Sequence, residues 1–220
     1  MEIDIGNVLG PVTRTVRNFE KDGKAASTVT LTRLYDTSVD DLWDALTNAQ
    51  RIPRWFLPIE GDLKLGGKYQ LKGNAGGTIT ACNPPRQFAA TWEFGGGITW
   101  IEVTVAADRG KARMTLAHTA IIEAHWNQFG PGAVGVGWDL ALMGLGQHLS
   151  TGVSPDHAAA EAWMGSPNGK EFMSQSGEFW RAAHVMSGAD PTSAKERSDR
   201  TIAFYRGEKP PDVAHPGTGS

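Results

Sequence analysis

Two side chains on predicted strands could take part in acid–base chemistry. His118 ends the inward row of the segment ARMTLAHTA, where an imidazole could act as a general acid or base near neutral pH. A lone histidine on an apolar strand face is more often a hydrogen-bonded core residue. Glu102 shares a face with Trp100, opposite Ile101, and is therefore expected in solvent. If that assignment of faces were reversed, Glu102 would be the best candidate acid.

Other signatures of catalysis or cofactor binding are missing. The six histidines show neither HxH nor HExxH spacing, and the sequence has no G-x-S-x-G turn. Cys82 precedes two prolines and has no base beside it in the sequence. Residues 130–135 (GPGAVG) match G-x-G-x-x-G but follow no apolar strand, so they do not predict a dinucleotide site. We therefore expect no metal ion and no cofactor, and we assign no catalytic residue.

The aromatic side chains favour binding over catalysis. The loop PRWF carries Trp55 and Phe56 directly after Pro53, although polar residues are more usual in such a turn. These two rings either plug the core or form a lid over an opening. On a later strand, the period of two places Trp92 and Phe94 on one face, as sheet core or as the wall of a cavity.

An ordered series of elements must position these side chains. Residues 28–35 alternate like a strand, and Ser38 is expected to cap a short helix, with Asp41 completing a capping box. At least five strands joined by hairpins follow, which predicts an antiparallel sheet. Residues 133–152 return to helical spacing, with an apolar stripe at Trp138, Leu142, Leu145 and Leu149.

The glycines inside this last helix need an explanation. Gly144 and Gly146 each disfavour a helix by about 0.5–1 kcal/mol relative to alanine. Either the backbone packs closely at these positions, or they leave room for a ligand above the helix.

The chain is expected to contain one main domain with additions at both ends. We assign residues 1–27 to an N-terminal arm, 28–152 to the main domain, 153–206 to a helical extension and 207–220 to a disordered tail. In the extension, a polar residue precedes proline at three predicted helix starts: Ser154-Pro155, Ser166-Pro167 and Asp190-Pro191.

Several segments resemble the START-like SRPBCC superfamily, and most closely its branch of heat-shock-protein-90 ATPase activator homologues. They are DTSVDDLWDALTNAQRIPRWF, GGKYQL, GTITACNPPRQFAATWEF, ARMTLAHTA and GVGWDLALMGLGQHL. The resemblance implies an α+β helix-grip fold, in which a curved antiparallel sheet wraps around a long C-terminal helix and leaves a cavity between them. Members of the superfamily bind lipids, polyketides or other apolar molecules, and some act as cyclases or aromatases.

The sequence therefore predicts a protein that binds a small hydrophobic molecule in this cavity. The alternatives are a cyclase, aromatase or hydrolase that uses the same cavity, and a protein-interaction or co-chaperone-like module. The expected ligand-binding residues are Trp55, Phe56, Tyr69, Trp92, Phe94, His118, Trp138 and Leu142.

Composition limits the partners and the location. A net charge of −3 argues against a nucleic-acid surface. The sequence contains no run of 18 apolar residues, which would be needed to predict a membrane span. The single cysteine and the absence of a secretion signal favour the cytoplasm. An exposed Trp100 could contribute to a homodimer contact.

Overall fold

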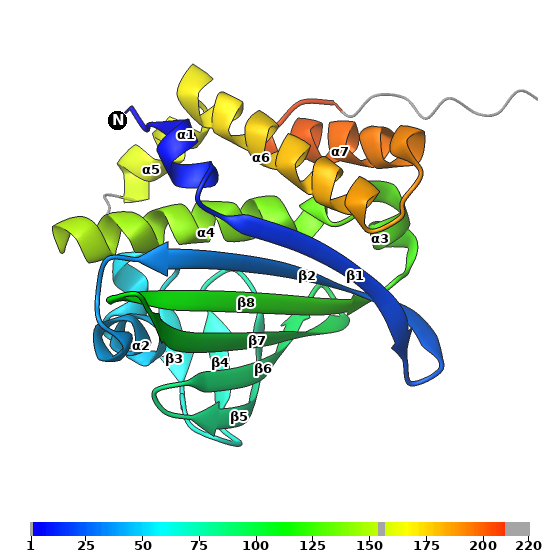
Figure 1. Cartoon of the computed structure of the whole chain (residues 1–220). Coiled ribbons are helices and arrows are strands. Elements are labelled where there is room, and N and C mark those ends of the chain that lie inside the picture. The colour runs from blue at the N-terminus through cyan, green and yellow to red at the C-terminus, as the bar shows by residue number, and fades with distance from the viewer. Residues whose placement is uncertain (1, 154–156, 210–220) are drawn as a thin grey trace, which may run out of the picture.

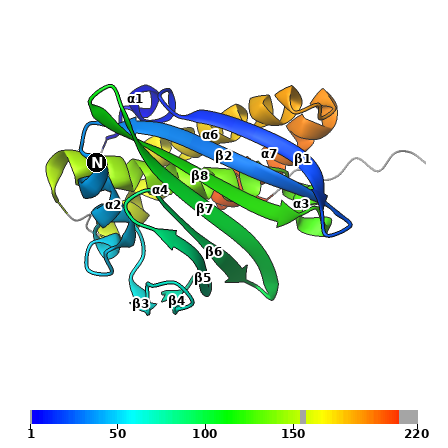
Figure 2. The same cartoon turned by 60° about the horizontal axis from the view of Figure 1, so that its bottom comes forward.

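An eight-stranded antiparallel sheet forms the framework of the protein (Figure 1). The structure is a computed structural model that describes residues 2–153 and 157–209. The strands, in their order across the sheet, are β1 (Thr13–Lys21), β2 (Lys24–Tyr35), β8 (Lys111–Ile121), β7 (Gly97–Asp108), β6 (Gln87–Phe94), β5 (Gly76–Asn83), β4 (Lys68–Leu71) and β3 (Ile59–Gly61). The short strands β3 and β4 curve away from the long strands, so the sheet forms a trough (Figure 2).

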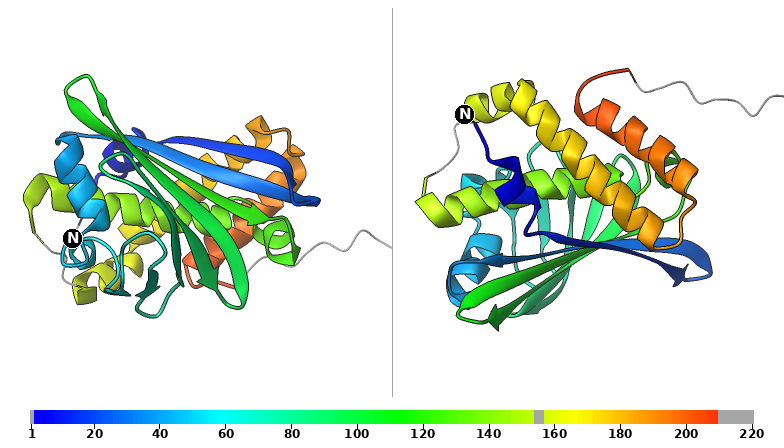
Figure 3. Two further views of the ribbon diagram at one scale, coloured as in Figure 1. Left: turned by 90° about the horizontal axis from the view of Figure 1, so that it is seen from below. Right: turned by 45° about the horizontal axis from the view of Figure 1, so that its top comes forward.

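The helices occupy one side of this sheet. They are α1 (Ile5–Leu9), α2 (Val39–Thr47), the 3₁₀ turn η1 (Ile52–Arg54), α3 (Ala124–Phe129), α4 (Gly132–Thr151), α5 (His157–Met164), α6 (Pro167–Met186) and α7 (Pro191–Tyr205). Helix α4 lies along the sheet, and α6 and α7 cover α4 from the outside (Figures 1 and 3). The expected α+β helix-grip architecture is confirmed.

Strand alternation correctly predicted the inner face of the sheet. Ile101 and Val103 on β7 pair with His118 and Leu116 on β8, and all four side chains are buried. Glu102 points to the outer face and is exposed, as expected. Trp100 shares that outer face and is half-buried. Inward apolar residues therefore line the trough.

The expectation of an N-terminal arm is wrong for residues 13–27. They form β1 and the first part of β2, which pair along their whole length and place β1 at the edge of the sheet. The hairpin turns at Asp22 and Gly23, which have φ angles of 52° and 75°. Asp-Gly is a strong signal for such a turn. It was missed because β1 is mostly polar and has only one fully buried side chain, that of Val16.

The expected helix caps are confirmed where the structure describes them. Ser38, Ser166 and Asp190 accept backbone N–H groups at the starts of α2, α6 and α7. The cap at Ser154-Pro155 lies outside the described residues. The capping box at α2 is wrong in part, because the Asp41 carboxylate contacts Thr37 and Arg51 instead of a backbone amide of its own helix.

Residues 124–129 form helix α3, which contacts α7. The Arg200 guanidinium and the Thr201 hydroxyl donate hydrogen bonds to the carbonyl oxygens of Gln128 and Phe129, each at 2.8 Å. These carbonyls are at the end of α3, where no further turn of helix can satisfy them. The partners come from 72 residues further along the chain, so local sequence did not reveal the helix.

Helix α4 is buried on two adjacent sides. Leu142 and Leu145 face the sheet as the sequence predicted, but Gly135, Asp139 and Met143 are buried as well. At Gly135 a methyl group would lie 2.2 Å from the Trp180 ring of α6, so glycine is needed for this close approach. The helices α6 and α7 of the additional segment therefore pack against the rest of the protein, with Phe172, Met173 and Trp180 almost fully buried.

The most buried ion pair joins three of these elements. The guanidinium of Arg14 on β1 donates two hydrogen bonds to the Asp139 carboxylate of α4, at 2.8 and 3.0 Å. From α6, the Ser176 hydroxyl and the Trp180 indole N–H donate to the same carboxylate at 2.6 and 3.0 Å. The side chains of Arg14 and Asp139 are 4% and 0% exposed. The carboxylate therefore fixes how α4 is rotated about its own axis.

None of the helices in the described ranges has the length and apolar character needed to cross a membrane.

Replacing Asp139 with asparagine should remove about 3–5 kcal/mol from the free energy of unfolding, because a buried arginine would lose its counter-ion. Urea denaturation measures this loss. The same change at Asp199, whose exposed ion pair with Lys195 spans 2.7 Å, should change stability by less than about 0.5 kcal/mol. Equal effects at the two positions would contradict the structural role of Asp139.

Candidate functional site

The Trp55–Phe56 loop is held between α2 and α4. Pro53 lies in η1, and the Trp55 indole N–H donates a hydrogen bond of 2.9 Å to the carbonyl oxygen of Ala45 in α2. The Trp55 and Phe56 rings stack with centroids 5.4 Å apart, and Phe56 stacks in turn on Trp138 of α4 at 6.1 Å. The loop is thus a fixed wall that connects two helices.

Gly144 allows this wall to approach α4. A methyl group at this position would lie 2.4 Å from the carbonyl oxygen of Trp55. Of the two explanations for this glycine, close backbone packing is therefore correct, and room for a ligand above it is wrong. At Gly146 the nearest atom would be 3.5 Å away, on Arg33, which is ordinary contact.

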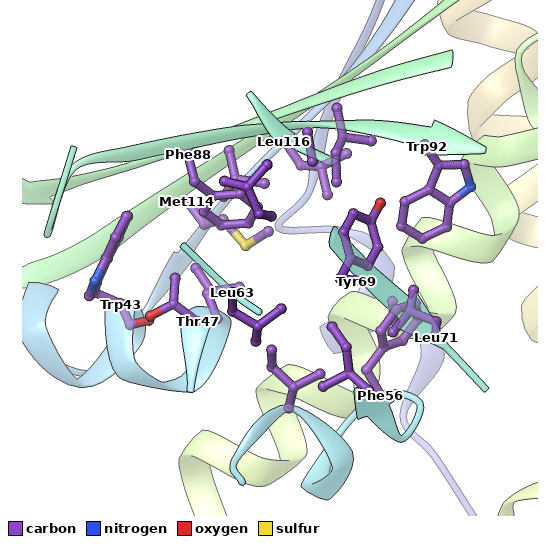
Figure 4. A pocket seen from close by; sticks show the side chains of 18 of the residues that line it. Trp43, Thr47, Phe56, Leu63, Tyr69, Leu71, Phe88, Trp92, Met114 and Leu116 are labelled. Carbon is purple, nitrogen blue, oxygen red and sulfur yellow. The ribbon is translucent and has the colours of Figure 1, made fainter. Parts of the chain in front are cut away.

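An apolar cavity lies between the inner face of the sheet, the α2–η1–β3 segment and α4 (Figure 4). Its volume is about 260 Å³, and its lining exposes far more apolar than polar surface. Aromatic rings from several elements line it: Trp43, Trp55, Phe56, Tyr69, Phe88, Trp92 and Trp138. Among the described residues of the lining, Pro84 in the turn between β5 and β6 is the one that is exposed, which indicates that the cavity reaches solvent there.

The structure brings six of the eight expected ligand-binding residues to this cavity. They are Trp55, Phe56, Tyr69, Trp92, Trp138 and Leu142. Phe94 does not line it, because β6 ends there and the side chain is 62% exposed at the tip of the hairpin with β7. His118 does not line it either.

His118 lies in the core beside the cavity. Its Nδ1 accepts a hydrogen bond of 2.9 Å from the Trp138 indole, and its Nε2 is 2.8 Å from the Thr99 hydroxyl. Because the Thr99 hydroxyl donates to the carbonyl oxygen of Trp92, it accepts from Nε2–H, and the imidazole is neutral. Burial lowers the pKa of His118 to about 4. His118 therefore orients Trp138 and is poorly suited to exchange protons with a ligand.

Trp43 also lines the cavity, although it is not among the eight expected ligand-binding residues. It occupies the same face of α2 as Leu46 and Thr47, at helical positions i, i+3 and i+4, and all three line the cavity. Its ring meets Phe88 edge-on at 6.1 Å. The helical spacing is visible in the sequence, but the sequence does not show that this face of α2 meets Phe88 on β6.

The polar side chains of the lining mostly bond to the protein itself. The Tyr69 hydroxyl donates to the carbonyl oxygen of Thr91 at 2.7 Å, and the Thr47 hydroxyl donates to that of Trp43 at 2.8 Å. Burial, with a smaller effect of Glu93, raises the pKa of Tyr69, so this phenol stays protonated. Within the described part of the chain, no group of three or more metal-ligating side chains comes close enough to hold an ion.

Comparisons with known proteins agree with this geometry. Residues 36–150 match the family model described as Activator of Hsp90 ATPase homolog 1-like protein. The solution structure of CalU16 from Micromonospora echinospora is 30% identical to this chain, with a TM-score of 0.68, and covers 81% of this chain and 97% of CalU16. Its crystal structure gives 28% identity, a TM-score of 0.63 and coverage of 78% and 97%. The chain therefore belongs to this family of Hsp90 ATPase activator homologues.

The likeness to CalU16 extends beyond the segment that the family model matches. A more distant structure, MLL2253 from Mesorhizobium loti, shares the fold at 17% identity and a TM-score of 0.51, covering 56% of this chain and 96% of that one. Among curated proteins, none matches this chain in sequence.

Replacing His118 with glutamine should make stability less dependent on pH. Between about pH 6.5 and pH 4 the unfolded chain binds a proton at His118 that the folded chain does not, so stability falls as the pH falls through this window. Glutamine keeps an acceptor for the Trp138 N–H but takes up no proton. From pH 7 to pH 5 the variant should therefore lose about 1–2 kcal/mol less than the unmodified protein.

Urea denaturation at the two pH values measures the difference. The contributions of the other histidines and of the carboxylates to the pH dependence cancel, because both proteins contain these groups. Identical losses would show that His118 is already protonated in the folded protein or remains neutral in both states.

Proposed function

We propose that the protein binds a small hydrophobic molecule in the cavity between the sheet and α4. The cavity itself carries this proposal: it is apolar, reaches solvent beside Pro84 and is about 260 Å³ in volume. Sites for small molecules are typically about 300–1,000 Å³, whereas an apolar cavity of about 150 Å³ is enough to hold benzene. The size thus suits a compact ligand.

Affinity would come from removing apolar surface from water. Burying about 200 Å² of ligand surface contributes about 5 kcal/mol before the loss of translational and rotational freedom is counted. The flat faces of Phe56, Trp92 and Trp138 are held in place by their neighbours, which limits the loss of side-chain entropy on binding. The protein is therefore largely prepared for its ligand.

Catalysis in the same cavity has weaker support. Among the described residues of the lining, only Tyr69 and Cys82 have titratable side chains. Cyclases and hydrolases need an acid or base placed beside the reacting atoms. The nearest histidine, His118, is already bonded through both ring nitrogens. A binding protein fits this lining better than an enzyme.

A protein-interaction module also has weaker support. The apolar side of α6 faces the interior, where Phe172 and Trp180 are 0% and 1% exposed. The side of α6 that carries these two rings is therefore covered within the chain and is not free to contact a partner. The single cysteine, Cys82, favours a cytoplasmic location for this binder.

Filling the cavity tests the proposal. Ala90 lies on the inner face of β6 and lines the cavity, whereas its neighbour Ala89 faces the other side of the sheet. With the neutral fluorophore N-phenyl-1-naphthylamine as probe, Ala90→Leu should weaken binding at least ten-fold because it occupies ligand space. Ala89→Leu should leave affinity within about two-fold of the unmodified protein.

Circular dichroism and thermal unfolding confirm that both variants are folded before binding is compared. Equal affinity in the two folded variants, or no binding to the unmodified protein, would contradict a ligand site in this cavity.

A further inference from the structure

We propose that the ligand of this cavity is an uncharged aromatic molecule and that the cavity excludes the corresponding carboxylates. This inference rests on the proposed function and specifies the chemical class of its ligand. It follows from the charges, the hydrogen bonds and the ring geometry of the lining.

The lining supplies no counter-ion. Among the described residues that form it, none is aspartate, glutamate, lysine, arginine or histidine. An ionised group that leaves water without a partner is strongly disfavoured, by several kcal/mol even after the protein relaxes. A carboxylate or an ammonium group would therefore have to remain outside the opening near Pro84.

The lining also has few free hydrogen-bond donors. Four polar side chains already donate to protein acceptors at 2.7–2.9 Å: Thr47, Trp55, Tyr69 and Trp138. A ligand that recruited one of them would break an existing bond and leave a buried carbonyl or imidazole unpaired. That exchange gains little, because the lost bond and the new one are of similar strength.

The indole N–H groups of Trp43 and Trp92 donate to no protein acceptor within the described ranges, and neither nitrogen is among the buried unpaired atoms there. Both nitrogens lie on the side of their rings away from the other labelled side chains (Figure 4). These two indoles therefore present their apolar ring atoms to the cavity and offer no donor to a buried charge.

The rings of the lining favour a flat ligand. Phe56 lies nearly parallel to Trp138, at 6.1 Å and 24° between ring planes, and Trp92 tilts against Trp138 at 5.0 Å and 58°. These rings pack against one another as offset and tilted pairs. A ligand ring could extend the cluster with the same offset or edge-to-face contacts, each worth about 0.5–1.5 kcal/mol beyond area burial. An aliphatic chain of equal area cannot make them.

The experiment compares 2-acetylnaphthalene with 2-naphthoate, which have the same rings and nearly the same size but differ by one charge at pH 7.5. Equilibrium dialysis against the full chain gives both dissociation constants. We expect 2-acetylnaphthalene to bind at least 100-fold more tightly than 2-naphthoate. Undecan-2-one, a neutral aliphatic ketone of similar size, should bind at least ten-fold more weakly than 2-acetylnaphthalene.

A positive charge beside the cavity should reduce the preference for the neutral ketone over the carboxylate. Thr47 lies at the last turn of α2 and lines the cavity, so Thr47→Lys adds an ammonium group where the helix tolerates one. The ratio of the two dissociation constants should fall at least ten-fold in this variant.

The outcomes separate the two proposals. Comparable binding of ketone and carboxylate, or tighter binding of undecan-2-one, would overturn the uncharged aromatic class while leaving a ligand site in the cavity. If none of these compounds nor N-phenyl-1-naphthylamine binds, both proposals fail.

Discussion

The buried carboxylate of Asp139 determines how α4 sits in the protein. It accepts hydrogen bonds from Arg14, Ser176 and Trp180, which come from the edge strand of the sheet and from α6. Removing the charges of Arg14 and Asp139 from water is unfavourable. The buried pair is tolerated because the hydrogen-bond partners satisfy the carboxylate. With Asp139 held between β1 and α6, Trp138 and Leu142 on the adjacent side of α4 face the trough of the sheet.

That rotation of α4 produces the cavity. Trp138 and Leu142 face inward, and the Trp55–Phe56 loop packs against the helix at Gly144, where the Trp55 carbonyl leaves no room for a side chain. The curved sheet and the helix are then held apart by large rings that contact one another but do not fill the space. His118 accepts a hydrogen bond from the Trp138 indole N–H and so holds this ring in position. The same contacts that stabilise the fold therefore shape the ligand site.

The sequence predicted those features that depend on local periodicity. Alternation placed Ile101, Val103 and Leu116 on the inner face, and helical spacing identified Leu142 and Leu145. It could not show that α4 is buried on two sides, because that depends on α6, which follows much later in the chain. Phe94 was misplaced since alternation does not reveal where a strand leaves the core. His118 was correctly placed inside, but its distance from the cavity depends on Trp92 and Trp138, which lie in other elements.

The central claim is that the space between sheet and helix is an apolar site for a ligand. Crystals of the full chain soaked with 2-acetylnaphthalene test it most directly. The account predicts difference density for the two fused rings inside the cavity, in contact with Phe56, Trp92 and Trp138, with the loop at Trp55 in place. Density elsewhere on the surface, or an interior in which these rings have closed the space completely, would contradict it.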